Sequence, residues 1–257
     1  MINKKSIQKA CLSFGKSGPF DHCIIDNFFE RKIALKLESE FPDFNSKVWH
    51  RYDNAIEIKK VCNNWNDFPE LTYQVFNYLN SEEFLKFLTN KISKKKLYSD
   101  IGLNGGGWHI HKQGGKLNQH LDYSLHPKLG LERKLNIIIY LNSNWKKEWK
   151  GNLGFWSNES NKEPGNLVRE IEPKFNRAIL FDTTQNSWHG LPEPVNCPKG
   201  EYRKSLAIYY LCKPSKKTDN RGKALFAPSE DQKNDKSVIE LIKRRANVKT
   251  ASSTYRK

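Results

Sequence analysis

The hydrophobic and polar positions change their period near residue 97. Before it, apolar residues recur at helical spacing in ERKIALKLESEF, in ELTYQVFNYLN after Pro69 and in EEFLKFLTNKI after Ser81. After it, glycines cluster between short runs rich in β-branched and aromatic residues, which predict strands. These runs are LNIIIYLN (135–142), GNLGFW (151–156), RAILFD (177–182) and KSLAIYYL (204–211). Too few helical stretches separate them for a parallel α/β sheet, so the pattern favours a sandwich or jelly roll.

We therefore predict an α+β protein, mainly β, with a double-stranded β-helix (jelly-roll) core and supporting N-terminal helices. Residues 1–96 are predicted to form the mainly helical support region of the same domain, and residues 97–213 the core. Residues 214–257 turn polar and lysine-rich, which indicates a basic C-terminal extension with one helix, SVIELIKRRA. Residues 1–20 have the pattern of a loose leader, and residues 47–66 show no clear period.

Length and composition indicate a folded body without a membrane segment. The 257 residues include 14 Phe, 10 Tyr and 7 Trp, too many large rings for a disordered chain. No apolar run approaches the roughly 18 residues that a spanning helix needs, and none follows the N-terminal lysines as in a secretory signal. The five cysteines form no CxxC pair, which argues against structural zinc and a disulfide scaffold. We expect a cytoplasmic protein from a reducing compartment.

The formal net charge of +16 has two interpretations. A basic surface is typical of nucleic-acid binders. However, the chain has 34 Lys, 10 Arg and 25 Asn, the bias that AT-rich codons produce, whereas base and phosphate recognition relies on arginine. The sequence favours genome composition as the source of the charge and keeps a nucleic-acid partner as the alternative.

Three residues in the β region form a candidate metal site. In His120-Leu121-Asp122 the two polar side chains would share one face of a strand, and His189 follows the run RAILFD. Two imidazoles and one carboxylate on one face are typical of Fe(II) sites that keep open positions for oxygen chemistry. A surface turn with incidental polar residues is the alternative. His109 and His111 are a rival pair, but no carboxylate follows them at similar spacing.

A basic residue supplies the second part of the pattern. Arg203 begins the last strong strand, and Ser205 lies on its same face. A buried arginine needs an anionic partner, which a dicarboxylic cosubstrate would supply through a bidentate fork. An exposed charge at the start of a strand is the alternative interpretation of Arg203.

Residues 100–213 resemble the iron(II)- and 2-oxoglutarate-dependent oxygenases of the prolyl-4-hydroxylase-like branch. The motifs that carry the resemblance are GGKLNQHLDY (114–123), IIIYLNSNWKKEWKGNLGFW (137–156), IEPKFNRAILFDTTQNSWHGLPEPV (171–195) and YRKSLAIYYL (202–211). The resemblance implies that His120, Asp122 and His189 are the catalytic iron ligands.

The resemblance also implies the cofactor set and its other contacts. Arg203 falls on the residue that pairs with the distal carboxylate of 2-oxoglutarate, assisted by Ser205, and Tyr140 on a tyrosine that hydrogen-bonds the same carboxylate. His111 falls, with a one-residue gap, where the family usually has tyrosine near the metal and substrate. The implied cofactors are Fe(II), 2-oxoglutarate as cosubstrate and O2, with ascorbate as an auxiliary reductant.

The implied reaction is hydroxylation of an unactivated C–H bond in a peptidyl proline or a small molecule, with release of succinate and CO2. The alternatives are an oxidative demethylase of nucleic-acid bases and a non-catalytic jelly-roll module that binds a ligand without iron. The sequence predicts a peptide or small-molecule partner and no membrane partner.

Overall fold

A computed structural model describes residues 1–160 and 162–254. Its helices are α1 (Lys4–Cys11), α2 (Arg31–Ser39), α3 (Glu70–Leu79), α4 (Glu82–Leu88) and α5 (Lys236–Ala246), with the short helices η1 (Trp65–Asp67), η2 (Thr89–Ser93), η3 (Lys147–Trp149), η4 (Glu230–Gln232) and η5 (Ala251–Thr254). Its strands are β1 (His22–Ile25), β2 (His50–Asp53), β3 (Glu57–Cys62), β4 (Tyr98–Ser99), β5 (Gly107–His111), β6 (Lys116–Leu117), β7 (His120–Leu121), β8 (Glu132–Tyr140), β9 (Leu153–Ser160), β10 (Glu163–Ile171), β11 (Ala178–Asp182), β12 (His189–Gly190), β13 (Arg203–Cys212) and β14 (Leu225–Phe226).

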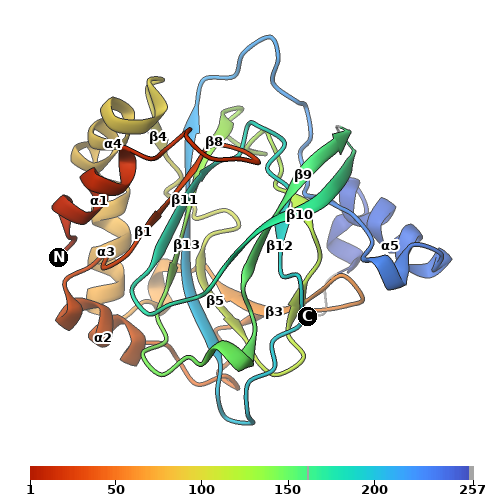
Figure 1. The fold of residues 1–257 in the computed structure, drawn as a ribbon, viewed down its shortest axis with the longest axis horizontal. Helices are drawn as coiled ribbons and strands as arrows, with labels where there is room; N and C mark the ends of the chain where they lie inside the picture. The colour runs from red at the N-terminus through yellow and green to blue at the C-terminus, as the bar shows by residue number, and fades with distance from the viewer. Residues whose placement is uncertain (161, 255–257) are drawn as a thin grey trace.

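Two antiparallel sheets form the body of the molecule (Figure 1). The nine-stranded sheet has the order β1-β11-β8-β13-β5-β3-β2, with β4 beside β13 and β6 beside β3. The five-stranded sheet has the order β10-β9-β12-β7-β14. Most neighbours in both sheets, such as β8 and β13 or β7 and β12, are distant in sequence, which is typical of a jelly roll. The predicted fold, mainly β with supporting N-terminal helices, is confirmed.

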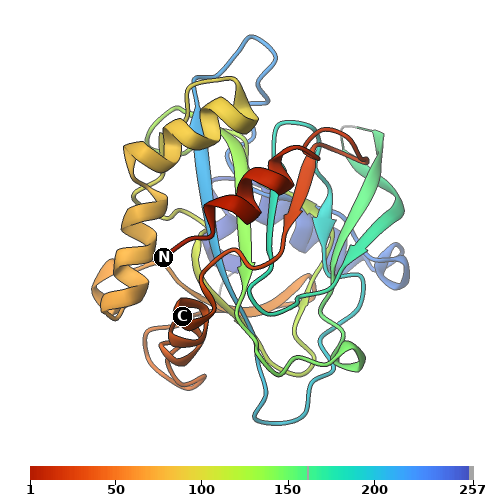
Figure 2. The same cartoon turned by 60° about the vertical axis from the view of Figure 1, so that its left-hand side comes forward.

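Helices α1 to α4 cover the outer face of the large sheet (Figure 2). The alternation along β13 divides its side chains between two environments, because successive residues of a strand point to opposite faces. Leu206, Ile208 and Tyr210 pack into the core shared with these helices. Arg203 and Ser205 point the other way, into the space between the sheets. The large sheet thus has an apolar outer face and a partly polar inner face.

Two segments differ from the sequence predictions. Residues 1–20 are not a loose leader, since they include helix α1, whose Ile7 and Cys11 are buried against the large sheet. Residues 47–66 contain strands β2 and β3. Inward-facing polar side chains on β3, Glu57 and Lys59, hide the hydrophobic alternation that would have predicted this strand.

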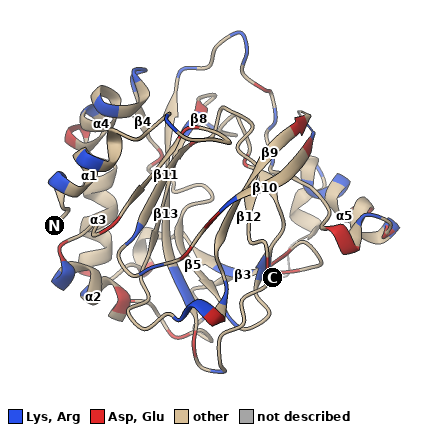
Figure 3. Cartoon of the chain, viewed as in Figure 1, with Lys and Arg blue, Asp and Glu red and all other residues tan. Residues whose placement is uncertain are grey.

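The segments on either side of the predicted core share its sheets. Strands β1, β2 and β3 join the large sheet from before residue 97, and β14 joins the small sheet from beyond residue 213. The division of the chain at residues 96 and 213 therefore stays a prediction. In the described ranges, no helix combines the length and apolar composition needed to cross a bilayer. Lys and Arg are spread over helices, strands and loops (Figure 3).

Candidate active site

The fold brings His120, Asp122 and His189 together, although His189 is far from the other two in sequence. His120 and His189 are direct partners across strands β7 and β12. One potential ligand atom from each residue of the triad lies within 4.8 Å of the others, and all three side chains are buried. Asp122 bridges the pair, with one carboxylate oxygen 3.9 Å from His120 Nε2 and the other 3.8 Å from His189 Nε2.

Backbone contacts orient both imidazoles in the same way. Nδ1 of His120 lies 3.0 Å from the carbonyl of Asn118, and Nδ1 of His189 lies 2.8 Å from the carbonyl of Ser187. A carbonyl only accepts, so each Nδ1 carries the proton and each Nε2 presents its lone pair toward Asp122. Burial, reinforced by the neighbouring His189, holds the pKa of His120 well below its ordinary value. Neutral imidazoles beside a carboxylate suit a divalent metal.

Two further side chains hold the Asp122 carboxylate. Tyr209 Oη donates a hydrogen bond of 3.1 Å to Oδ1, and Arg133 Nη1 lies 3.4 Å from the same oxygen. Burial alone would raise the pKa of Asp122, but His189, Arg133 and His120 together lower it below its ordinary value. Oδ2 has no hydrogen-bond partner among the described residues. The carboxylate is thus ionised, fixed at one oxygen and available to a cation at the other.

Arg203 lies in the same cavity, on the large sheet, and is 3% exposed, which excludes the surface-charge alternative. Its Nε donates to the carbonyl of Gly151 at 2.7 Å, and its Nη2 donates to Tyr140 Oη at 3.2 Å. In the part of the chain that the structure describes, no carboxylate forms an ion pair with it. A buried guanidinium with only neutral partners leaves a site for an anion.

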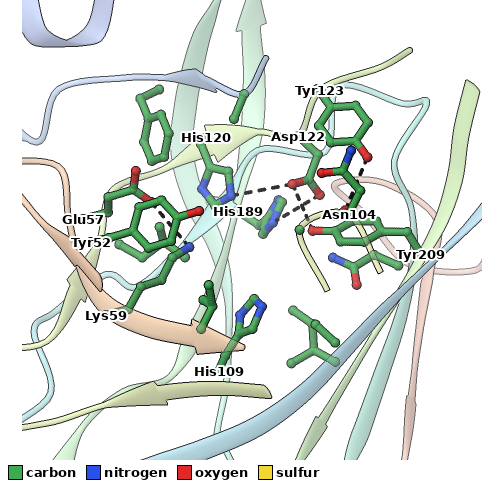
Figure 4. A pocket seen from close by; sticks show the side chains of 18 of the residues that line it. Tyr52, Glu57, Lys59, Asn104, His109, His120, Asp122, Tyr123, His189 and Tyr209 are labelled. Carbon is green, nitrogen blue, oxygen red and sulfur yellow. Dashed lines mark hydrogen bonds and ion pairs between the residues drawn. The ribbon is translucent and has the colours of Figure 1, made fainter. Parts of the chain in front are cut away.

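A cavity of about 230 Å³ is lined by both the triad and Arg203. Figure 4 shows the three triad side chains around it. Ser205 and His111 also line it, whereas Tyr140 reaches it only through its hydrogen bond to Arg203. Neither ring nitrogen of His111 has a hydrogen-bond partner in the described residues. Every predicted site residue therefore either lines the cavity or, like Tyr140, contacts a residue that lines it.

The rival pair His109 and His111 points into this same cavity. Within the described ranges, no third histidine, cysteine or carboxylate joins the pair in a metal-binding group. The arrangement therefore favours the triad over the HxH pair as the metal site.

Sequence reasoning missed Tyr209, Arg133 and Lys59, which also line the cavity. Tyr209 shares the face of Arg203 and Ser205 along β13, so the alternation that selected those two residues also indicates Tyr209. Arg133 lies between the rings of Tyr123 and Tyr209, with its Cζ 3.3 and 3.5 Å from their centroids. A register shift between β8 and β13 next to Arg133 turns its side chain inward, which no local pattern indicates.

The C-terminal segment supports the metal end of the cavity. Phe226 pairs with His120 across β14 and β7, and its ring stacks on the imidazole with centroids 4.9 Å apart. Arg221 donates two hydrogen bonds to the carbonyl of Asp122, at 3.1 and 3.0 Å. Arg245 on α5 donates a hydrogen bond of 3.0 Å from its Nε to Glu57 Oε1 on β3. Residues beyond the predicted core therefore contact two of the three triad residues.

Comparison with known proteins agrees with this geometry. A sequence model of the 2OG-Fe(II) oxygenase superfamily matches residues 106–211. The prolyl 3-hydroxylase OGFOD1 of Xenopus laevis is 27% identical over 196 residues, which are 76% of this chain and 35% of that protein. The chain spans about a third of the length of the curated relatives it matches, since the share is 30% for the protein from Mus musculus.

Two solved structures show the same fold. A prolyl-4-hydroxylase of Pseudomonas putida has a TM-score of 0.59 and 12% identity, and covers 81% of this chain and 100% of its own. A prolyl hydroxylase of Trichoplax adhaerens, in complex with a hypoxia inducible factor peptide fragment, has a TM-score of 0.57 and 17% identity, and covers 81% of this chain and 88% of its own. The predicted cofactors, Fe(II), 2-oxoglutarate and O2, follow from the family match and the buried triad. Residues 106–211 thus resemble the 2OG-Fe(II) oxygenase superfamily, and the fold of the chain resembles that of the prolyl hydroxylases.

Proposed function

We propose that the protein hydroxylates an unactivated C–H bond of a peptidyl proline, with conversion of 2-oxoglutarate to succinate and CO2. The observation that carries the proposal is the shared cavity, which has a buried triad on one wall and, on the other, an arginine that no carboxylate of the described residues neutralises. Relatives named prolyl 3-hydroxylase and a fold shared with prolyl-4-hydroxylases support proline as the target. A small-molecule substrate is the second candidate predicted from the sequence.

In this proposal His120, Asp122 and His189 hold the iron. Their donor set fits Fe(II), because two neutral imidazoles and one ionised carboxylate meet on one side of the cavity. Together with 2-oxoglutarate and O2, bound iron supplies the oxidising power needed to break a strong C–H bond. The carbonyls of Asn118 and Ser187 keep each Nε2 unprotonated, and Tyr209 fixes the carboxylate of Asp122.

Arg203 and Tyr140 orient the cosubstrate. The guanidinium of Arg203 would form an ion pair with the distal carboxylate of 2-oxoglutarate, and Tyr140 Oη, already bonded to Arg203, would donate to the same group. Ser205 and His111 line the cavity near them, with hydroxyl and ring nitrogens available for further hydrogen bonds. The strands that carry these four side chains are buried neighbours in the large sheet, which keeps bulk water from this end of the cavity.

The test is succinate formation with Fe(II), 2-oxoglutarate and O2 over proline-containing peptides, with mass spectrometry of each peptide. We expect one added oxygen atom on proline, derived from isotopically labelled O2, and loss of turnover in His120→Ala, Asp122→Ala and Arg203→Ala. Fragment spectra and amino-acid analysis then assign the ring position, which matters because the named relatives include both 3- and 4-hydroxylases. Wild-type turnover that persists with an iron chelator would contradict the proposal. Stimulation by free metabolites but by no peptide would assign the small-molecule alternative.

The cytoplasmic location predicted from the cysteines stays part of this proposal. All five cysteines, which lie in the described ranges, are free and buried. Free thiols are typical of proteins kept in a reducing compartment.

A further inference from the structure

A second cavity, of about 360 Å³, adjoins the active-site cavity beside strands β2 and β3. Tyr52 and Lys59 line both cavities, and Lys59 Nζ lies 5.2 Å from the centre of the Tyr52 ring. Figure 4 shows these two side chains on the side of the active-site cavity opposite Asp122. The two cavities are therefore neighbours that share these two side chains as a wall. We call this second cavity the β2–β3 groove and define it by Phe44, Arg51, Tyr52, Lys59, Lys60 and Lys112.

The β2–β3 groove is positively charged. Its lining has four cations and one acid, Asp53, which already forms an ion pair with Arg51. Lys59 pairs with Glu57 of the active-site cavity, at 3.4 Å, whereas no carboxylate of the described residues forms an ion pair with Lys60 or Lys112. Burial and the nearby charges of Arg51 and Lys112 lower the pKa of Lys60 below its ordinary value. Cations that repel one another in a partly desolvated groove favour binding of an anion, which relieves the repulsion.

The groove is also organised before any ligand binds. Lys60 Nζ donates a hydrogen bond of 2.6 Å to the carbonyl of Phe44 and lies 3.9 Å from the centre of its ring. The Phe44 ring in turn stacks on Tyr202, with centroids 4.7 Å apart and planes 7° apart. Tyr202 directly precedes Arg203, so this wall is continuous in the chain with the cosubstrate site. A lysine held in this way loses little conformational freedom when it binds a carboxylate.

We propose that the β2–β3 groove binds acidic side chains of an extended peptide, next to the residue that enters the active-site cavity. This inference rests on the proposed function and narrows its substrate to a proline peptide with neighbouring Asp or Glu. A substrate of one residue would leave the groove unused. A nucleic acid would require a longer row of cations, whereas the Lys and Arg of this chain are spread over the fold (Figure 3).

The test is a direct binding measurement on the full chain, so that it does not depend on turnover. The probes are two fluorescein-labelled peptides with a central proline, one flanked by glutamates and one by glutamines. We expect the glutamate peptide to bind about tenfold more tightly in low salt, and the difference to shrink as salt is added. The double variant Lys60→Gln/Lys112→Gln should lose about tenfold in affinity for the glutamate peptide only.

The matched control removes two lysines elsewhere. Lys5→Gln/Lys9→Gln changes the net charge equally on helix α1, which packs beside β1 at the opposite end of the large sheet from β2. Its peptide affinity should equal that of the wild type. An equal loss in both double variants would assign the effect to net charge and overturn the groove assignment. Tight binding of oligothymidylate that depends on Lys60 and Lys112 would assign the groove to nucleic acid and also overturn it.

The two proposals fail separately. Equal affinity for both peptides, in a protein that converts 2-oxoglutarate to succinate on proline peptides, would overturn the groove inference and leave the proposed function intact. Charge-dependent binding without hydroxylation of any proline peptide would leave the groove assignment intact and contradict the peptidyl-proline reaction.

Discussion

The two ends of the active-site cavity are built in different ways. At the cosubstrate end, Arg203, Ser205 and Tyr140 lie on β13 and β8, strands of ten and nine residues that pair along most of their length. At the metal end, His120 and His189 lie on strands of two residues each, joined by a single paired position. The cosubstrate end is thus built on long paired strands, and the metal end on very short ones.

The metal end gains its support from a distant part of the chain. Strand β14 pairs with β7, Phe226 stacks on His120, and Arg221 bonds the carbonyl of Asp122. These residues lie beyond residue 211, where the match to the superfamily ends. The comparison teaches that ligand geometry depends on local strand pairing at one end of the cavity and on an added segment at the other.

The largest expected effect comes from removing a ligand at the metal end. Asp122→Ala leaves two neutral imidazoles, and we expect iron affinity and succinate formation to fall by more than about 100-fold. Affinity for 2-oxoglutarate at the Arg203 end should change much less when it is measured without iron. Metal analysis after anaerobic loading measures the first quantity, and calorimetry the second. Asp122→Asn, which keeps the shape of the side chain, separates loss of charge from loss of packing.

The next largest effect is expected at the cosubstrate end. Arg203→Ala removes the buried cation, and we expect the Kd for 2-oxoglutarate to rise by about 100-fold, or about 3 kcal/mol. Iron content should match that of the wild type, because Arg203 touches none of the triad. Arg203→Lys should recover part of the affinity, since it restores the charge without the bidentate fork. A parallel loss of iron would break the distinction between the two ends.

A smaller effect tests the support from the C-terminal segment. Phe226→Ala should weaken iron binding by about tenfold, because partners that orient metal ligands typically contribute 10- to 100-fold in affinity. The affinity for 2-oxoglutarate should stay unchanged. The control is Leu225→Ala on the same strand, whose side chain packs with Leu121 and Trp188 away from the cavity. Unchanged iron affinity in Phe226→Ala would contradict the supporting role of β14.

The last prediction concerns the pH dependence of folding stability through His109, which lines the cavity. Burial, followed by the charge of Lys59, lowers the pKa of His109 from 6.5 to about 3. As the pH falls, the unfolded chain takes up this proton first, so stability is lost below pH 6.5, at about 1.4 kcal/mol per pH unit. His109→Gln should remove this part of the slope in urea unfolding.

Metal loading completes the pH experiment. Mn²⁺ should suppress protonation of His120 and His189 as ligands and leave the slope from His109 in place. A metal-loaded protein whose stability does not depend on pH in this range would show that His109 is protonated to the same extent in both states.

Most of the core strands and most of the proposed ligands were predictable from local pattern. The runs that became β8, β11 and β13 combine β-branched and aromatic residues with the period of a strand, so the jelly roll follows from them. The HxD pair, His189 and Arg203 are polar residues in or beside apolar strand-like runs, so the sequence alone indicates them as candidate site residues. Strand β3 escaped prediction because Glu57 and Lys59 face the cavity and break the alternation.

The amino-acid sequence by itself determined the strand periods, the helical N-terminal stretches and the set of residues able to bind iron and a dicarboxylate. These features depend on side chains near one another in the chain, so they can be read locally. Tertiary structure decided that His189 meets His120, that Arg133 turns toward Asp122, and that the C-terminal segment supports the metal end. Strand pairing between distant segments fixes these contacts, and no local period encodes which strands will pair.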